Sequence, residues 1–205
     1  MTSLSTCAWK AVNVEISTAT LSDGSDALRV VKGEAKRMRF DENTYARLEG
    51  EDFHNGTIRV KLLSRLLPDA PDFARGFIGI VFRANAGDNE FESFYIRPTN
   101  ALADDPQRRA HGCQYFAYPG YTFAYFREYG IEGYEAPIGC ELDEWIDLKA
   151  EIHGNRAAFF LNGSPEPVLT VNGLKHGPNA RGGVGLFVDI GTEGFFRDLE
   201  ILRDD

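Results

Sequence analysis

The sequence predicts an all-β protein whose strands pack as a two-layer antiparallel β-sandwich. The first observation is an alternation of apolar and polar residues with a period of two, which recurs along much of the 205-residue chain. Such alternation places one set of side chains in a core and the other set outside it. The second observation is the composition, because 15 Phe, 8 Tyr and 21 Gly favour pleated strands joined by tight turns. The third is that no long segment carries an apolar stripe of helical period.

Individual strands and turns can be assigned from the residue pattern. Ile58, Val60 and Leu62 point to one side of a strand, while Arg59 and Lys61 point to the other. Asn-Gly pairs at 55–56, 162–163 and 172–173 mark turns, because both residues tolerate positive φ. Many short strands with few helices between them indicate a sandwich rather than a parallel sheet. Further strands are expected around residues 12–16, 28–30, 78–82, 146–152, 157–161, 168–171, 184–190 and 196–201.

Two segments do not fit the strand pattern. Residues 41–48 are the best helical candidate, although they are too short for more than a turn or two. Residues 98–140 form a long irregular stretch that is rich in Gly, Pro, Tyr and charged residues. Long loops in a compact domain are usually functional or mobile, so the functional site is sought first along this stretch. Within it, Arg108 and Arg109 are expected on a solvated loop beside two aspartates.

Charge and cysteine content limit the class of protein. A net charge of −9 argues against a nucleic-acid partner, which would need a positive face. No stretch approaches the roughly 18 apolar residues of a membrane span, so no membrane partner is expected. The N-terminus shows no secretory signal, and three cysteines without metal-type spacing suggest free thiols. We therefore expect a cytoplasmic protein with one domain over residues 1–205, no cofactor and no metal, a mature secreted form being the alternative.

Three segments resemble concanavalin A-like (laminin G-like) jelly rolls. Residues 144–163 read EWIDLKAEIHGNRAAFFLNG, in which Trp opens a strand, a Gly turn follows and the partner strand ends in Asn-Gly. The closing run GTEGFFRDLEI at 191–201 resembles the terminal strand of the same group. GFIGIVFR at 76–83 followed by ESFYIR at 92–97 is similar to paired strands of the 3-keto-disaccharide hydrolase-like branch. The resemblance covers roughly residues 53–202 and implies a curved sheet whose concave face carries a ligand groove, most commonly for sugars.

Two carboxylates are candidate catalytic residues, Glu92 and Asp189. Glu90 and Glu92 share one face of a strand at about 6.5–7 Å, within the range that an inverting glycosidase uses for its two carboxylates. The alternative is a solvated strand start, and the third acidic residue of retaining jelly-roll glucanases is replaced here by aromatic residues. Asp189 alternates with apolar neighbours, so we expect it to project from the opposite face as a base, a sugar ligand or a calcium ligand. A turn-capping Asp before Gly191 is the alternative.

A second group of residues has the chemistry of sugar binding. Arginine offers a rigid fork of donors, and tyrosine offers a flat apolar body with a polar tip. Arg83 and Arg97 each end a strand, and both are expected to face outward. Glu92 and Arg97 fall on opposite faces of their strand unless a bulge intervenes, and simple cross-strand pairing is the structural alternative. The candidate substrate-binding residues are Arg83, Tyr95, Arg97, Asn100, His111, Gln114, Tyr115 and Tyr118.

Two functions are consistent with these residues. The first is a carbohydrate-active enzyme that binds and hydrolyses or processes a small glycoside or oligosaccharide, and the second is a non-catalytic, lectin-like carbohydrate-binding module. A structural partner-binding sandwich is a third alternative. Two carboxylates that face one groove would favour the enzyme, whereas a groove lined by aromatic and amide groups without paired acids would favour the lectin. No phosphate loop, nucleophile elbow or dinucleotide fingerprint occurs in the sequence.

Overall fold

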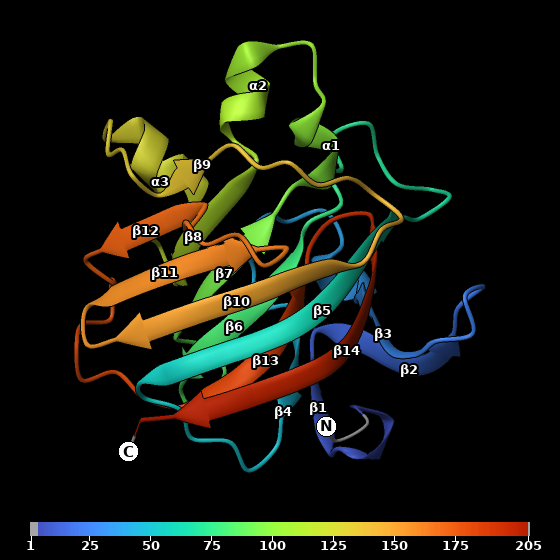
Figure 1. Ribbon diagram of the computed structural model, residues 1–205, viewed down its shortest axis with the longest axis horizontal. Helices are drawn as coiled ribbons and strands as arrows, with labels where there is room; N and C mark the ends of the chain where they lie inside the picture. Colours follow the sequence, from blue (N-terminus) through green and yellow to red (C-terminus); the bar gives the residue numbers. More distant parts are fainter. Residues whose placement is uncertain (1–3, 205) are drawn as a thin grey trace.

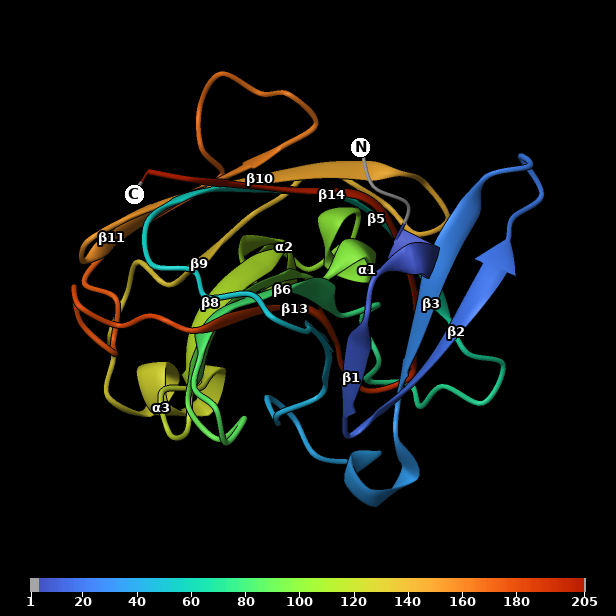
Figure 2. The same cartoon turned by 90° about the horizontal axis from the view of Figure 1, so that it is seen from below.

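The computed structural model describes residues 4–204 and contains two antiparallel seven-stranded sheets packed face to face (Figures 1 and 2). The first, sheet A, has the spatial order β1 (Trp9–Val12), β4 (Tyr45–Leu48), β13 (Gly183–Val188), β6 (Ile78–Ala84), β7 (Phe91–Ile96), β8 (Cys113–Tyr118) and β9 (Glu135–Ala136). The second, sheet B, has the order β12 (Leu169–Asn172), β11 (Arg156–Leu161), β10 (Ile146–His153), β5 (Gly56–Leu66), β14 (Thr192–Arg203), β3 (Asp26–Lys32) and β2 (Val14–Thr20). The predicted two-layer antiparallel sandwich is confirmed.

The main core lies between the two sheets. Ile58, Val60 and Leu62 of β5 face it from sheet B, as their alternation predicts. Phe94 of β7 meets Phe159 of β11 across the core, with stacked rings whose centroids are 4.2 Å apart. Aromatic pairs of this kind add to the free energy gained by burying their surface, so the ring pair fastens one sheet to the other.

The segments that resemble a jelly roll form the expected elements. Residues 144–163 contain the β10–β11 hairpin, in which Leu148 pairs with Leu161 and His153 with Arg156. Gly154 occupies the turn with φ +54°, a conformation that glycine adopts without steric cost. The closing run forms β14, which lies between β5 and β3 in the middle of sheet B.

The two segments outside the strand pattern were predicted less well. The helix expected at 41–48 is wrong, because residues 45–48 form β4, paired with both β1 and β13. The stretch 98–140 is not one irregular loop. It contains α1 (Pro98–Ala101), α2 (Pro106–Ala110), β8, α3 (Phe123–Glu128) and β9. Strand β8 is buried on both faces, so its sequence CQYFAY lacks the polar alternation that marks a half-exposed strand.

The outer face of sheet A is apolar and covered by the chain itself. Its aromatic side chains form a second buried cluster that includes Tyr45, Phe91, Phe116 and Phe187. Residues 40–43, which follow the short helix η2 (Glu34–Lys36), lie against this face and contact β7, β8 and the turn before β7. Figure 2 shows η2 and α3 on the side of sheet A that faces away from sheet B. We call residues 40–43 the strap.

The helical segments of the described residues are all short. Besides α1, α2 and α3, they comprise η1 (Leu4–Thr6) and η2. None of the helices within residues 4–204 has the length and apolar composition needed to cross a membrane.

Candidate functional site

A cavity of about 390 Å³ opens where the outer face of sheet A meets its surrounding loops. Its walls come from the strap, the loop at 73–77, the ends of β7 and β8, the α1–α2 segment above the sheets in Figure 1, and α3. We call this cavity the arginine–phenylalanine pocket. Its lining side chains are Phe40, Phe73, Arg75, Phe77, Tyr95, Arg97, Asn100, Asp105, Gln107, Arg108, His111, Phe123 and Arg127.

One wall of the pocket is aromatic. The ring of Phe40 is central, with its centroid 5.6 Å from Phe73, 5.9 Å from Phe77 and 5.7 Å from Phe123. Phe77 is buried, whereas Phe40 and Phe73 are each 39% exposed. Large apolar side chains that remain this exposed in a pocket provide a surface for a ligand with an apolar face.

Arg97 and Arg127 both line the pocket and share one carboxylate. Nη1 of Arg97 lies 2.7 Å from Oε1 of Glu135, and Nη2 of Arg127 lies 2.7 Å from the same atom. Arg97 also donates to the hydroxyl of Tyr95 at 2.8 Å and to the side-chain oxygen of Gln114. Burial opposes the charge of Arg97, but the neighbouring acidic groups outweigh it and raise its pKa. These contacts fix the guanidinium group of Arg97 at the base of the pocket.

Arg75 and Arg108 also line the pocket, without a carboxylate partner among residues 4–204. Nη1 of Arg75 donates to the backbone oxygens of Asp72 and Ala74, at 2.7 Å and 2.8 Å. Nε of Arg108 donates to the side-chain oxygen of Asn100 at 2.9 Å. Burial, together with the charges of Arg108 and Arg97, lowers the pKa of Arg75. Both groups therefore carry charge that the surrounding protein solvates only through neutral acceptors.

A buried chain of polar groups fixes the strap behind the pocket. Asp189 is fully buried, pairs with Lys32, and accepts hydrogen bonds from the backbone N–H groups of Asp41 and Ile190, at 2.9 Å and 2.8 Å. Asp41 accepts from the hydroxyl of Tyr95 at 2.9 Å. Burial and then the charge of Asp189 raise the pKa of Asp41 to about 6. Because Asp41 follows Phe40, this network positions the aromatic wall.

A separate buried cluster lies at the other end of β7, between the two sheets. Glu92 accepts a hydrogen bond from the hydroxyl of Tyr115 at 2.7 Å, and Nη1 of Arg83 lies 3.5 Å from its other oxygen. The side chains of Arg83 and Glu92 are both 0% exposed. Arg83 also donates to the backbone oxygens of His54 and Gly154, which flank strands of sheet B. The cluster joins the two sheets and contributes no lining residue to the pocket.

The orientation expected for Arg83 is wrong. Arg83 has φ +54° beside a register shift in the β13–β6 pairing, and this irregularity directs its side chain between the sheets. Arg97, in contrast, does lie on the outer side of sheet A. The regular pairing of β7 with β6 and β8 confirms that Glu92 and Arg97 fall on opposite faces of the strand.

The predicted binding residues thus fall into two places. Tyr95, Arg97, Asn100 and His111 line the pocket. Gln114 lies behind Arg97, with its amide nitrogen unpartnered. Outside the pocket, Arg83 and Tyr115 belong to the inter-sheet cluster, and Tyr118 stacks on Phe91 at 5.2 Å.

The two candidate catalytic carboxylates also lie apart. Glu92 belongs to the inter-sheet cluster, whereas Asp189 pairs with Lys32 behind the strap, and neither lines the pocket. Glu90 lies near Asn85 in an exposed turn. A catalytic role for Glu92 or Asp189 stays a prediction, and the proposed function below does not use it.

Nine pocket residues were not found as binding residues from the sequence. Arg108 was assigned to a solvated loop, although its side chain turns into the pocket. The sequence offers one signal for Phe73 and Arg75: an aromatic residue and an arginine follow directly after the Pro-Asp turn at 71–72. The residues missed are Phe40, Phe73, Arg75, Phe77, Asp105, Gln107, Arg108, Phe123 and Arg127.

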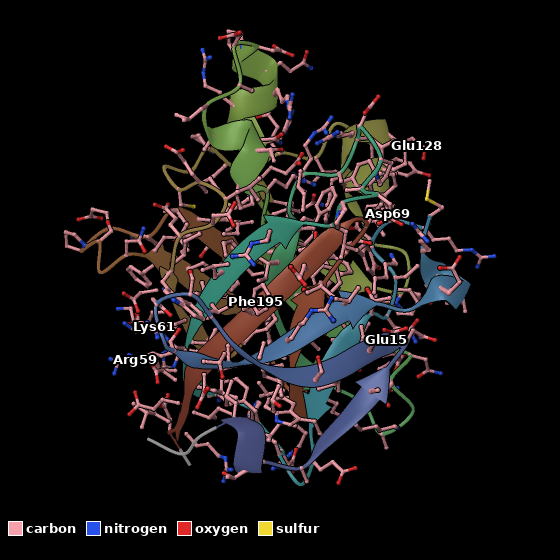
Figure 3. All side chains as sticks on the ribbon, turned by 90° about the vertical axis from the view of Figure 1, so that its right-hand side faces the viewer. Glu15, Arg59, Lys61, Asp69, Glu128 and Phe195 are labelled. Atoms are coloured by element: carbon pink, nitrogen blue, oxygen red, sulfur yellow. The ribbon has the colours of Figure 1, made fainter. Side chains whose placement is uncertain are left out.

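Two further hollows bear on the choice of site: one adjoins the pocket, and the other lies on the outer face of sheet B. A cavity of about 410 Å³ adjoins the pocket, and His111 and Arg127 line both. A hollow of about 520 Å³ lies on the outer face of sheet B, where Lys149 sits 3.8 Å from the ring centroid of Phe160. Figure 3 shows Arg59 and Lys61 pointing from sheet B to the exterior. Arg59 pairs with Glu200 and Lys61 pairs with Asp147, so the charges of both cations are balanced on the outer face of sheet B.

The remaining reactive groups do not gather into a site. Cys113 and Cys140 are free thiols, and burial raises the pKa of each to about 12. Within residues 4–204, no group of three or more His, Cys, Asp or Glu side chains is arranged to hold a metal ion. Thiolate chemistry at neutral pH is therefore disfavoured at these two cysteines.

Comparison with solved structures identifies the fold. The chain is similar to the carbohydrate-binding module CBM66 from Bacillus subtilis, with a TM-score of 0.56, 14% identity, and coverage of 93% of this chain and 95% of that one. A Bacillus subtilis protein of unknown function with a galectin-like fold gives 0.51 and 15%, covering 95% and 90%. A Bacillus licheniformis β-glucanase gives 0.50 and 12%, covering 97% and 86%. The chain therefore has the concanavalin A-like jelly-roll fold that the resemblance implied.

Sequence comparison adds no closer relationship. No family model matches the chain, and no curated protein matches it. At identities of 12–15%, the likeness to the solved structures concerns the fold. Function must therefore be argued from the pocket.

Proposed function

We propose that the protein is a non-catalytic, lectin-like carbohydrate-binding domain, and that its ligand occupies the arginine–phenylalanine pocket. The observation that carries this proposal is the pairing of two unlike walls across one cavity. Half-exposed Phe40 and Phe73 form the apolar wall, and guanidinium and amide donors form the polar wall. A sugar ring has C–H groups that pack on an aromatic surface and hydroxyl groups that hydrogen-bond to fixed polar groups.

The carboxylates of the pocket favour binding over hydrolysis. A glycosidase of the usual kind needs two carboxyl groups that flank the scissile bond. Asp105 is the one carboxylate that lines the pocket among residues 4–204, and it caps α2 by accepting a hydrogen bond from Gln107 N at 2.9 Å. Glu132 and Glu135 line the adjoining cavity, where Arg97 and Arg127 hold Glu135 in ion pairs. Glu92 and Asp189 are occupied by buried cationic partners elsewhere. A lectin-like function requires neither carboxylate.

The surroundings of the pocket support an oligosaccharide ligand. The adjoining cavity is separated from the pocket by His111 and Arg127, which line both. A ligand with more than one sugar unit would extend from one cavity into the other over these two side chains. The shared fold with a carbohydrate-binding module is consistent with this function.

The proposal is tested by measuring binding and turnover together. The protein is applied to an array of glycans, each binding glycan is confirmed by a thermal shift, and the same glycans and nitrophenyl glycosides are assayed for hydrolysis. We expect binding without turnover. Hydrolysis of a bound glycan would contradict a non-catalytic function, and a complete lack of binding would contradict carbohydrate recognition.

Truncation of the aromatic wall should weaken ligand binding. Phe73→Ala removes a half-exposed ring from the rim, and we expect the affinity for a bound glycan to fall by about tenfold, as for other aromatic binding residues. Isothermal titration measures the change. Tyr129→Ala is the matched control, because Tyr129 is 64% exposed and does not line the pocket. Equal affinities for the Phe73 variant and the unmodified protein would place the ligand elsewhere.

A further inference from the structure

The pocket concentrates positive charge in a protein that is acidic overall. The chain has 31 Asp and Glu residues against 22 Lys and Arg residues. The pocket reverses this balance, with four arginines and one aspartate among its lining residues. This local excess is a property of the site and does not follow from the composition of the chain.

The unbalanced charge belongs to two of the four arginines. Glu135 contacts both Arg97 and Arg127, and its pKa lies below the ordinary value, because these partners outweigh burial. Arg75 and Arg108 have no ion pair within residues 4–204, and their hydrogen bonds go to backbone, amide and hydroxyl oxygens. These two guanidinium groups therefore have no carboxylate partner in the part of the chain that the structure describes.

Arg75, Arg97 and Arg108 also act on one another. They converge on the same cavity, and the charges of Arg108 and Arg97 add to burial in disfavouring the charged form of Arg75. Like charges that are brought together in a partly desolvated site destabilise one another. An arrangement of this kind is stabilised when a ligand supplies the opposite charge.

A neutral sugar would leave this repulsion in place. Its hydroxyl groups accept hydrogen bonds from a guanidinium group but do not neutralise its charge. A carboxylate or sulfate group accepts parallel, charge-assisted hydrogen bonds from the planar fork of arginine and offsets the repulsion as well. The electrostatics of the pocket therefore favour a ligand with an oxyanion.

We propose that the ligand is an acidic carbohydrate whose carboxylate or sulfate group binds between Arg75 and Arg108, while its sugar ring packs on Phe40 and Phe73. This inference rests on the proposed function and names the ligand class of the same pocket. The oxyanion gives the site its selectivity, and the aromatic wall distinguishes a sugar from a simple inorganic anion.

The experiment uses oligosaccharides of equal length in three forms. One set is neutral, one carries uronate carboxylates and one carries sulfate esters, and all three are presented on one array. Bound uronates are then titrated calorimetrically beside their methyl esters, which remove the charge and retain the sugar. We expect the acidic form to bind at least about tenfold more tightly than its neutral counterpart. The affinity should also fall as the salt concentration rises.

Three substitutions locate the effect. Arg75→Gln and Arg108→Gln should each weaken binding of the acidic glycan by about tenfold. Binding of a neutral glycan should weaken by a smaller factor, because glutamine keeps a hydrogen-bond donor and the charge matters only to the oxyanion. Arg59→Gln is the matched control, because this arginine lies on the outer face of sheet B and pairs with Glu200 at the surface. Circular dichroism and thermal unfolding verify that each variant is folded.

The possible results separate this inference from the proposed function. Preference for either the uronate or the sulfate set, lost on substitution of Arg75 or Arg108, supports the inference and identifies the oxyanion. Binding of neutral glycans as tightly as acidic ones overturns it and leaves carbohydrate binding intact. Acidic binding that is insensitive to both substitutions overturns the assigned site. Failure to bind any of the three sets overturns both proposals.

Discussion

Glu92→Ala is expected to lower the free energy of unfolding by about 3–5 kcal/mol, the usual cost of removing one partner from a buried ion pair. The substitution leaves the guanidinium group of Arg83 buried between the sheets without its carboxylate. It also removes the acceptor for the hydroxyl of Tyr115 and for the backbone N–H of His176. The loss is large because the side chains of Arg83 and Tyr115 are buried and cannot replace the carboxylate with water.

Urea unfolding followed by circular dichroism measures this change. Glu90→Ala is the control, since Glu90 lies two residues away on an exposed turn and should change stability by less than about 0.5 kcal/mol. Glu92→Gln keeps an acceptor for Tyr115 and should cost less than Ala, so it provides a measurable value where the Ala variant does not fold. A loss below about 1 kcal/mol for both substitutions would contradict a structural role.

Asp41→Asn is expected to change how stability depends on pH. The pKa of Asp41 is about 6 in the folded protein, raised from the ordinary 3.8 by burial and by the charge of Asp189. The folded state therefore binds this proton more tightly than the unfolded chain. Its contribution to stability is fully present below pH 4 and is lost as the pH rises through about 6. The difference of about two pKa units corresponds to about 3 kcal/mol above pH 7.

The measurement compares unfolding free energies of the unmodified protein and the Asn variant from pH 4 to pH 8. Relative to the unmodified protein, Asp41→Asn should gain stability as the pH rises, because the variant has no carboxyl group to deprotonate. The variant must be compared with the unmodified protein because other groups also make stability depend on pH. The lowered pKa of Glu135, for example, makes stability rise with pH, which is opposite to the effect of Asp41. Asp104→Asn, the same exchange at an exposed position, should shift stability by less than about 0.5 kcal/mol. Parallel profiles for the Asp41 variant and the unmodified protein would contradict the assignment.

The fold could be predicted because the alternation of apolar and polar residues that marks a strand can be recognised within a short stretch of sequence. Alternation such as that of Ile58, Val60 and Leu62 specifies one buried face, and β10 shows the same pattern. The pattern failed for β8, which is buried on both faces and lies within the stretch at 98–140. Strand β8 shows no polar alternation because Gln114 and Phe116 lie on the covered outer face of sheet A, while Tyr115 faces the core. Residues 45–48 were assigned to a helix for a related reason, since β4 is short and mostly buried.

The pocket could be predicted only in part, because it is assembled from distant segments. Tyr95 and Arg97 were found because they lie at the end of one strand, and His111 because it lies in the long stretch after it. Phe40 and Phe73 come from loops whose approach depends on the buried contact of Asp41 with Asp189. A carboxylate that is paired with Lys32 behind a loop is indistinguishable in the sequence from one that faces a substrate. The same ambiguity applies to Glu92.

Amide chemical shifts measured with and without a bound acidic oligosaccharide test the central claim most directly. The pocket account predicts that the largest changes fall at residues 40–41, 73–77, 97–111 and 123–127, the segments that line the cavity. Little change is expected at residues 147–149, 160 and 163–164, which line the hollow on the outer face of sheet B. Changes concentrated on that second surface, with the lining segments of the pocket unaffected, would contradict the account.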